Sequence, residues 1–443
     1  MKRMWIVLAF LVTLPGVGTA AAQRLIWLGT LPGGGHSEAA GVSADGRFVV
    51  GTATDAHGRL HAVRWQIDWN AERWDWVTIE DLGTADGLHS GAADVSADGS
   101  VVVGTVAYPD ESVRAFRWHA ATGEMKVLGT LGGPGSTARA VSADGRFMVG
   151  WAENSEGHRR PFRYDAMTGE MQDLGTLGGP GGWANDISAD GRLVVGMAQD
   201  SVERYRAFLW DATTRAMQRL EVGAEEVATI SPDGRYVGGF ITEGRSVFPP
   251  LYVRFAVLFD LLTERRAVLD TLSEYVNYLY EPGDISSEGN LVVGWARNNF
   301  IYPPHQVAVL WRPWTGIEEL NDTYADLLQD GSSLSTASAV SPDGRYILGQ
   351  GYNAATGRNE AYLLDTGIST AVEEAAPVAV RLVVYDLLGR SVRTLLEGPL
   401  SVGTHEVVWD GRSDAGVRLP AGLYLLRLEA NGQTQTRTIT IVR

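Results

Sequence analysis

Charged side chains are scarce where seven similar short segments of this chain would meet around a common axis. Those segments, each ending in Val-Ser or Ile-Ser, contain four charged residues: Asp94, Arg139, Asp186 and Asp284. Carboxylates brought together from different segments are the groups that acid–base cleavage of a glycan requires. A glycan-active hydrolase or lyase with its site at a central channel is therefore one hypothesis for the function.

Two glycine-rich segments have the spacing of a cofactor-binding motif but not its sequence context. Residues 133–138 (GPGSTA) and 179–184 (GPGGWA) fit the glycine spacing of a dinucleotide fingerprint, but that motif needs a strand before it and a helix after it. We interpret both as turns between repeats. The sequence has no cysteine, which excludes thiol nucleophiles and thiolate metal sites. It also lacks the spacings of a serine nucleophile elbow, a zinc protease or a phosphate-binding loop, so we expect no cofactor.

Histidines gather in, or at the rim of, loops predicted on one face of the fold. Only His57 and His61 have a spacing that suits metal ligands, and they lie across a turn rather than on one helix. We interpret the group as solvated loop residues and expect no metal site. Its members are His36, His57, His61, His89, His158 and His305.

Aromatic residues are concentrated in three long loops on the same predicted face, residues 246–252, 273–283 and 298–304. Aromatic rings offer a large apolar area and a polar tip at low entropic cost, which suits a ligand surface. We predict a binding patch here for a glycan or a protein. The alternative is that these rings pack on one another as a lid. The predicted ligand-binding residues are Phe248, Tyr252, Tyr275, Tyr278, Tyr280, Phe300 and Tyr302.

A repeated ten-residue pattern must position these residues. VSADGRFMVG at 141–150 recurs with small changes, and its Asp-Gly or Glu-Gly pair starts at residues 45, 98, 144, 190, 233, 288 and 343. Asp-Gly between apolar runs predicts a hairpin, and each repeat contains four short alternating segments without helical periodicity. Such four-stranded units repeated around an axis are the blades of a β-propeller.

The ends of the repeat region indicate how the ring closes. Residues 25–31 look like a fourth strand without the first three, and residues 360–365 like a third strand without a fourth. The N-terminal strand therefore completes the last blade and covers an edge that would otherwise invite aggregation. We predict an all-β chain with a seven-bladed β-propeller over residues 23–365.

These repeats resemble a known family. HAVRW at 61–65, RAFRW at 114–118 and RAFLW at 206–210, beside LGTLGG at 128–133, are similar to the HAF repeats of extracellular bacterial proteins. That resemblance implies an exported propeller and carries no general biochemical activity. Because the first strands offer few charged side chains to a central channel, we expect a secreted, non-catalytic binding module. A structural component of the cell surface is a further alternative.

The C-terminal part forms a second domain. Residues 366–377 are small and acidic and read as a linker, and apolar alternation in 379–385, 404–409, 422–428 and 434–442 predicts a small Ig-like β-sandwich over 378–443.

The sequence of this domain resembles two known kinds of domain. WDGRSDAGVRLPAGLYLLRL at 409–428 is similar to the Ig-like domain of the flagellar hook-capping protein. VYDLLGRSVRTL at 384–395 and LPAGLYLLRLEANGQ at 419–433 resemble type A sorting domains of the type IX secretion system, which implies the secretion machinery as a partner. GRSDAG at 411–416 departs from the sorting-domain pattern and favours the hook-capping variant. A plain structural cap remains the alternative.

The N-terminus and the charge suggest where the protein acts. Residues 1–22 have a basic start, an apolar run and small residues at Ala20–Ala22, as a signal peptide does, so we expect cleavage near Ala22 and an extracellular or cell-surface location. No segment offers about twenty consecutive apolar residues, so we expect no integral membrane segment. A formal net charge of −16 argues against a nucleic-acid partner.

Overall fold

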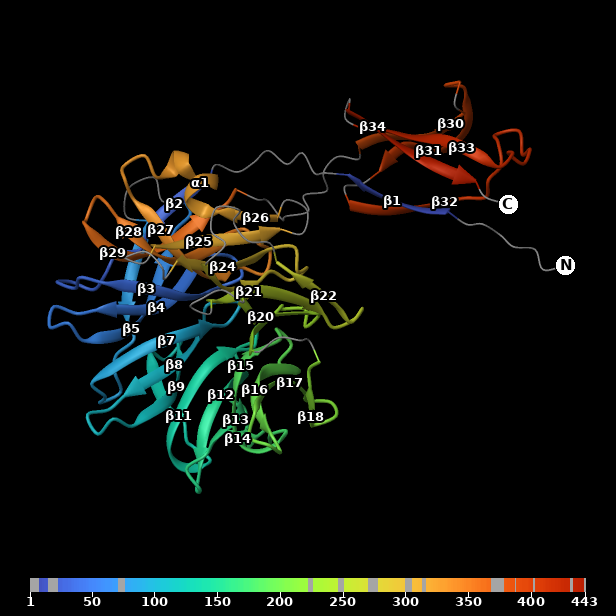
Figure 1. Ribbon diagram of the computed structural model, residues 1–443. Helices are drawn as coiled ribbons and strands as arrows, with labels where there is room; N and C mark the ends of the chain where they lie inside the picture. Colours follow the sequence, from blue (N-terminus) through green and yellow to red (C-terminus); the bar gives the residue numbers. More distant parts are fainter. Residues whose placement is uncertain are drawn as a thin grey trace. The chain divides into compact units, whose positions relative to one another are not determined.

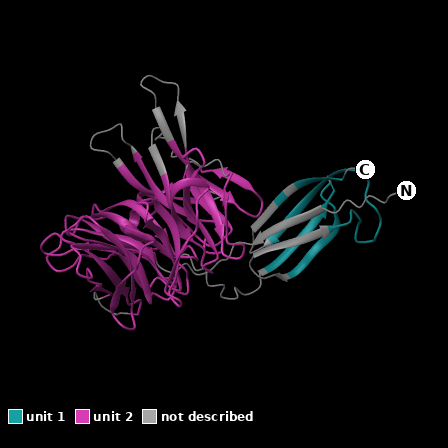
Figure 2. Ribbon diagram, turned by 90° about the horizontal axis from the view of Figure 1, so that it is seen from below, with its two compact units in different colours: residues 1–21, 369–443 teal, residues 22–368 magenta. Residues whose placement is uncertain are grey.

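The computed structural model describes residues 8–14, 23–70, 76–221, 226–245, 251–269, 278–298, 305–312, 316–367, 378–386, 388–400, 403–430 and 433–441. The chain divides into two compact units, residues 22–368 and residues 1–21 with 369–443, which Figure 2 colours separately. In the described part of the chain, no helix has the length and apolar character needed to cross a membrane.

The larger unit consists of seven four-stranded antiparallel sheets, as predicted (Figure 1). Blades one to three are β3 (Ser37–Val42), β4 (Phe48–Thr54), β5 (Leu60–Ile67) and β6 (Val77–Asp81); β7 (His89–Val95), β8 (Val101–Ala107), β9 (Val113–His119) and β10 (Glu124–Val127); and β11 (Gly132–Val141), β12 (Phe147–Asn154), β13 (Arg159–Asp165) and β14 (Glu170–Asp173). Blades four and five are β15 (Gly178–Ile187), β16 (Leu193–Asp200), β17 (Tyr205–Asp211) and β18 (Ala216–Arg219); and β19 (Glu226–Ile230), β20 (Tyr236–Arg245), β21 (Leu251–Asp260) and β22 (Arg265–Val268).

Blade six is β23 (Tyr278–Ile285), β24 (Val292–Asn298), β25 (His305–Arg312) and β26 (Gly316–Glu319), followed by a short helix α1 (Leu320–Thr323) and a 3-10 turn, Ala325–Leu327. Blade seven is β27 (Ser333–Val340), β28 (Tyr346–Asn353) and β29 (Arg358–Asp365), completed by β2 (Arg24–Trp27).

The seam between the two ends of the propeller confirms the predicted closure. Strand β2 pairs with β29, with Ile26 opposite Leu363, and the N–H of Leu28 donates to the carbonyl of Ala361 at 2.9 Å. Blade seven then packs on blade one, because Ile26 and Leu363 share a buried apolar cluster with Val49 of β4. The N-terminal strand is therefore an integral part of the last blade.

The repeated sequence pattern has a structural reason at each of its polar positions. Ser142 Oγ donates to Asp144 Oδ1 at 2.6 Å and accepts the N–H of Phe147 at 2.9 Å, which holds the first hairpin of blade three. Gly145 takes a φ of 69°, in the left-handed region that glycine tolerates. Blade six has Glu288 where the other blades have this aspartate, and there Asn290 accepts from Ser286 instead, at 2.8 Å.

The same hairpins join neighbouring blades. The N–H of Ala97 donates to the carbonyl of Ala143 at 3.0 Å, and four further pairs make the same bond: Ala44 to Ala97, Ala143 to Ala189, Ala189 to Pro232 and Ser287 to Pro342. Proline has no backbone N–H. The series therefore cannot continue from Pro232 or from Pro342 to the next blade.

The smaller unit contains a four-stranded sheet in the order β31 (Ser391–Leu400), β30 (Val378–Tyr385), β33 (Gly422–Ala430) and β34 (Gln433–Ile441). A second, two-stranded sheet pairs β32 (Gly403–Trp409) with β1 (Leu8–Leu14). Strand β31 was not predicted from the sequence. It contains Gly398 and Pro399, and both residue types are uncommon inside strands. The core of this unit includes Val384, Trp409 and Tyr424.

Candidate functional site in the central channel

The first strand of every blade contains a β-bulge that shapes the central channel. In β11, Ala138 pairs with Gly150 and Ala140 with Val149, so Arg139 between them is left unpaired. The same one-residue register shift occurs in all seven blades. The unpaired residues line a cavity of about 250 Å³: Ala40, Ala93, Arg139, Asn185, Ala228, Gly283 and Ser338.

The glycine that ends the repeat pattern makes this bulge possible. A Cβ on Gly150 would lie 1.9 Å from the carbonyl oxygen of Thr137, because the bulged strand approaches closely there. A Cβ added to the equivalent glycine of any other blade would lie 1.9 to 2.2 Å from a carbonyl oxygen; these glycines are Gly51, Gly104, Gly196, Gly239, Gly294 and Gly349. The repeat pattern therefore determines the shape of the channel wall through this glycine, and the hairpin through its Asp-Gly pair.

Three of the four predicted channel residues follow a bulge in alternate blades, two, four and six. Asp94 Oδ1 accepts the N–H of Val95 at 2.7 Å, and its Oδ2 accepts the N–H of Val141, in the next blade, at 2.8 Å. The carboxylate therefore ties blade two to blade three.

Asp186 and Asp284 each make the same two bonds, one within their own blade and one to the next blade. Asp186 binds the N–H groups of Ile187 and Ile230, and Asp284 those of Ile285 and Val340. Thr229 Oγ1 lies between the two carboxylates, 2.9 Å from Asp186 Oδ2 and 3.2 Å from Asp284 Oδ1. Thr229 occupies in blade five the position that these aspartates occupy in theirs.

The channel raises the pKa of all three carboxyls. Part of each side chain faces the cavity, but the surrounding blades exclude most water, and this desolvation raises the pKa of Asp94 to about 8 and that of Asp284 to about 7. The charge of Asp186 raises both pKa values further, and burial raises the pKa of Asp186 itself. The amide hydrogen bonds act in the opposite direction.

Arg139, the fourth predicted residue, reaches across to blade four. Its Nη1 donates to Asn185 Oδ1, and Asn185 Nδ2 donates to the carbonyl of Val227 at 2.6 Å. Burial lowers the pKa of Arg139, while the charge of Glu226 raises it. The structure therefore confirms that the four charged residues line the channel, and it adds Asn185 and Thr229 to them.

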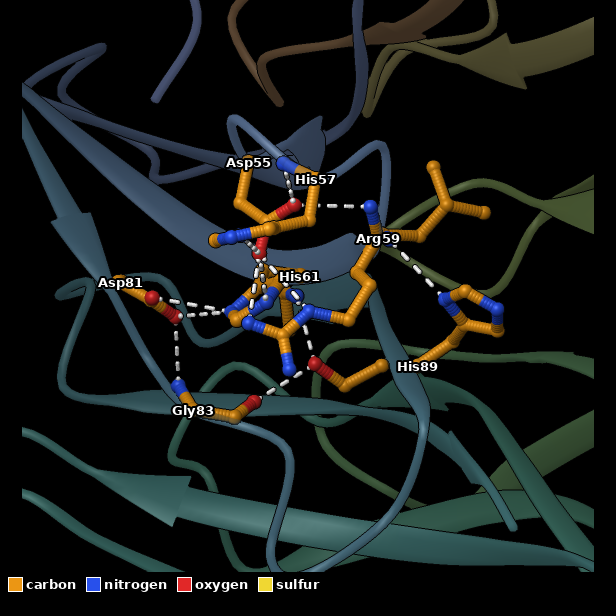
Figure 3. A network of polar contacts seen from close by, with 10 residues as sticks. Asp55, His57, Arg59, His61, Asp81, Gly83 and His89 are labelled. Carbon is orange, nitrogen blue, oxygen red and sulfur yellow. Dashed lines mark hydrogen bonds and ion pairs between the residues drawn. The ribbon is translucent and has the colours of Figure 1, made fainter. Parts of the chain in front are cut away.

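A second polar network lies in blade one, at the end where β4 turns into β5 (Figure 3). His61 Nδ1 lies 2.9 Å from Asp81 Oδ2, and its Nε2 lies 3.6 Å from Asp55 Oδ2 without a hydrogen-bond partner. His57 Nδ1 is 3.6 Å from the same Asp55 oxygen, and Arg59 Nη2 binds it at 2.8 Å.

The interpretation of these histidines as solvated is wrong for His61 and right for His57. The His61 side chain is 12% exposed because Asp55 and Asp81 enclose it, whereas His57 is 79% exposed. The residues described by the structure contain no group of three side chains suited to a metal ion. His61 stands where blade three has Arg160, which binds Asp173 through Nε at 3.0 Å, so the network is a variant of a repeated contact.

Most of the predicted aromatic patch lies outside the described residues. This applies to Phe248, Tyr275, Phe300 and Tyr302. The backbone of the remaining three lies in strands rather than loops, Tyr252 in β21 and both Tyr278 and Tyr280 in β23.

Register places the ends of these strands at one edge of blades five and six. Tyr252 pairs with Gly244 near the end of β20, and Tyr278 pairs with Asn298 at the end of β24. Asn298 in turn pairs with His305, at the start of β25.

The two glycine-rich decoys are strands. Residues 133–138 lie in β11 and residues 179–184 in β15, where the sequence reading expected turns. Each continues directly into a β-bulge and a hairpin, so no helix follows that could hold a pyrophosphate. The prediction that both segments are turns is therefore wrong.

The C-terminal region matches a known domain family. Residues 359–434 match the family model of the FlgD Ig-like domain. Two relatives, the basal-body rod modification protein FlgD of Salmonella typhimurium (strain LT2) and that of Salmonella typhi, are 34% identical over 125 residues, covering 27% of this chain and 53% of theirs. This chain therefore spans about half the length of the curated relatives it matches.

Solved structures with a similar fold are propellers of low sequence identity. The Swd1 (Cps50) β-propeller domain of Myceliophteria thermophila is 11% identical with a TM-score of 0.47, covering 77% of this chain and 99% of that one. TolB of Acinetobacter baumannii is 13% identical with a TM-score of 0.40, covering 73% and 81%. The sheet topology by itself defines the larger unit as a β-propeller, and the family-model match identifies a FlgD Ig-like domain in the C-terminal region.

Proposed function

We propose that this chain is an exported bacterial binding protein. Its propeller binds a glycan or a protein at the edge of blades five and six without catalysing a reaction. Its Ig-like domain serves export or attachment at the cell surface. The resemblance to HAF repeats and to type IX sorting domains supports the extracellular location and the secretion machinery as a partner.

The non-catalytic part of this proposal depends on the hydrogen bonds of the channel carboxylates. Each one accepts an N–H from its own blade and another from the next blade, as Asp94 does from Val95 and Val141. A general acid or base must offer an oxygen to substrate at hydrogen-bond distance. Both oxygens of these carboxylates already accept backbone N–H groups, so the carboxylates stabilise the ring of blades. This use weighs against a hydrolase or lyase with its site at the channel.

The binding surface is supported by the placement of the aromatic segments. Tyr252 and Tyr278 begin or nearly begin their strands, at the edge of the blades where β20 and β24 end. Aromatic side chains near a rigid sheet edge need little ordering on binding, which favours affinity. A glycan or a peptide segment suits such a surface.

An array of glycans and peptides tests this function. The chain without residues 1–22 is compared with a variant carrying Tyr275→Ala, Tyr278→Ala and Phe300→Ala. We expect the variant to lose at least tenfold in signal, since each large aromatic contact contributes on the order of 1 kcal/mol or more. Tyr352→Ala, which removes a tyrosine 42% exposed in blade seven, is the matched control and should bind normally. Equal binding by the triple variant would refute the proposal.

A further inference from the structure

The C-terminal unit has an incomplete second sheet. Strands β31, β30, β33 and β34 form one full sheet, whereas the described residues of the range 378–443 contribute only β32 to the other. Trp409, the last residue of β32, is 1% exposed and packs edge-to-face on Tyr424, with 6.2 Å between ring centroids. Trp409 places β32 against this core, yet among the described residues 378–386, 388–400, 403–430 and 433–441 no other strand pairs with β32.

In the full chain, residues 8–14 fill that position. Strand β1 pairs with β32 antiparallel in a continuous register from Leu8 opposite Trp409 to Leu14 opposite Gly403. A backbone edge paired in this way has its N–H and C=O groups satisfied, whereas an unpaired edge is a template for another strand.

The register matches the sequence pattern of the segment. Leu8, Phe10, Val12 and Leu14 lie opposite Trp409, Val407, His405 and Gly403, and directly opposed residues of an antiparallel pair share one face of the sheet. The positions of Leu8, Phe10, Val12 and Leu14 therefore share the face of Trp409, whereas those of Ala9, Leu11 and Thr13 belong to the other face. The segment has no charged residue.

Residues 8–14 belong to the segment that the proposed export removes. We infer that the edge of β32 is a docking site for one extended strand with large apolar residues at alternate positions, and that in the exported chain a partner protein supplies it. The recognition is strand addition, in which main-chain hydrogen bonds give affinity and alternate side chains give specificity. A second copy of this chain fits less well, because its β32 would bring His405 and Glu406 to the interface.

This inference rests on the proposed export, and the two can fail separately. N-terminal sequencing of secreted protein tests whether residues 1–22 are removed. The docking site is tested with the chain that starts at residue 23 and a synthetic peptide of residues 8–14, extended by a fluorophore and a lysine tail for solubility. Fluorescence anisotropy should show saturable binding, and the chain that retains residues 1–22 should bind at least tenfold more weakly.

Two N-methylated peptides distinguish strand addition from non-specific apolar binding. One is methylated at Ala9, Leu11 and Thr13, and the other at Phe10, Val12 and Leu14. Alternate N–H groups of a strand point to opposite edges, so one set should lose at least tenfold in affinity while the other binds like the parent peptide. Equal binding of the two, or no binding of the parent, would overturn the docking site. A dimer that the parent peptide dissociates would overturn the partner protein as occupant and assign a second copy instead.

Discussion

Asp94 Oδ2 accepts the backbone N–H of Val141, which lies one blade further round the ring, at 2.8 Å. The sheets of neighbouring blades are not hydrogen-bonded to each other as one sheet. This bond joins the first strands of two neighbouring blades directly, next to the central channel. Asp186 and Asp284 repeat it for blades four to five and six to seven. Each of these partly buried carboxyls joins two blades, and holding it there in its charged form has a free-energy cost because it is desolvated.

That cost predicts an unusual pH dependence. The folded-state pKa values of about 8 for Asp94 and about 7 for Asp284 lie above the ordinary 3.8, so the folded state binds more protons between these limits. Stability therefore falls as the pH rises through this window. Below about pH 4 the sign reverses, because carboxyls such as Asp211 and Asp260, whose pKa values arginine hydrogen bonds lower, lose their stabilisation on protonation.

We expect the melting temperature to rise by a few degrees from about pH 8 to about pH 5, and then to fall in stronger acid. Differential scanning calorimetry at several pH values measures this. Asp94→Asn should flatten the rise, and exposed Asp326→Asn should leave it unchanged. A profile that Asp94→Asn does not alter would contradict the assignment of the effect to the channel.

The seam strand gives a second prediction. Because Leu28 donates its N–H to Ala361, the alternation of an antiparallel ladder makes Ile26, two residues earlier, a donor to β29 as well. Ile26→Pro removes that bond from the strand that closes the ring. Because the acceptor on β29 is left unsatisfied, we expect a loss of about 1 to 3 kcal/mol in the free energy of unfolding, measured in urea.

Lys126→Pro is the matched control for the seam. Lys126 occupies the same place in β10, two residues before Leu128, whose N–H donates to Ala115 at 2.7 Å. Strand β10 is tethered to β9 by its own hairpin, so its loss leaves the ring closed. A seam variant no less stable than this control would show that β2 does not close the propeller.

A third prediction concerns the serine of the repeat. Ser142 is fully buried, and Ser142→Ala leaves the N–H of Phe147 without its acceptor. A buried unsatisfied amide costs about 1 to 3 kcal/mol. Denaturant unfolding should show a loss in that range for Ser142→Ala and less than about 0.5 kcal/mol for Ser112→Ala, a serine in an exposed turn. Comparable losses for both would contradict the role assigned to the buried serine.

The propeller could be predicted from the sequence because its repeat consists of local sequence features. Asp-Gly hairpins and alternating strands are local features, and the orphan segments at 25–31 and 360–365 indicated closure without any knowledge of distance. The β-bulge was not predicted. The glycine that permits it, Gly150 in blade three, lies within a strand, and the sequence alone does not show which backbone atoms of the neighbouring strand it approaches. Its repetition before each third strand was the available signal.

The candidate site was predicted in part for the same reason. Asp94, Arg139, Asp186 and Asp284 stood out because charge is rare in these strands. Their use as ties between blades depends on amides 44 to 56 residues away, as for Asp186 with Ile230 and Asp284 with Val340, and no local pattern shows such partners. Thr229 was missed because a threonine in a strand is unremarkable until its neighbours are known.

His61 offers the last prediction, because it substitutes for an arginine of the repeat. Arg160 binds Asp173 at the same place in blade three, so His61→Arg should bind Asp81 and change the free energy of unfolding by less than about 0.5 kcal/mol. His61→Ala leaves Asp55 and Asp81 facing each other without the imidazole between them and should cost about 1 to 3 kcal/mol. His57→Ala, 79% exposed in the same loop, should be nearly neutral. Urea unfolding of the three variants measures this, and a destabilising His61→Arg beside a neutral His61→Ala would show that blade one uses the position differently from blade three.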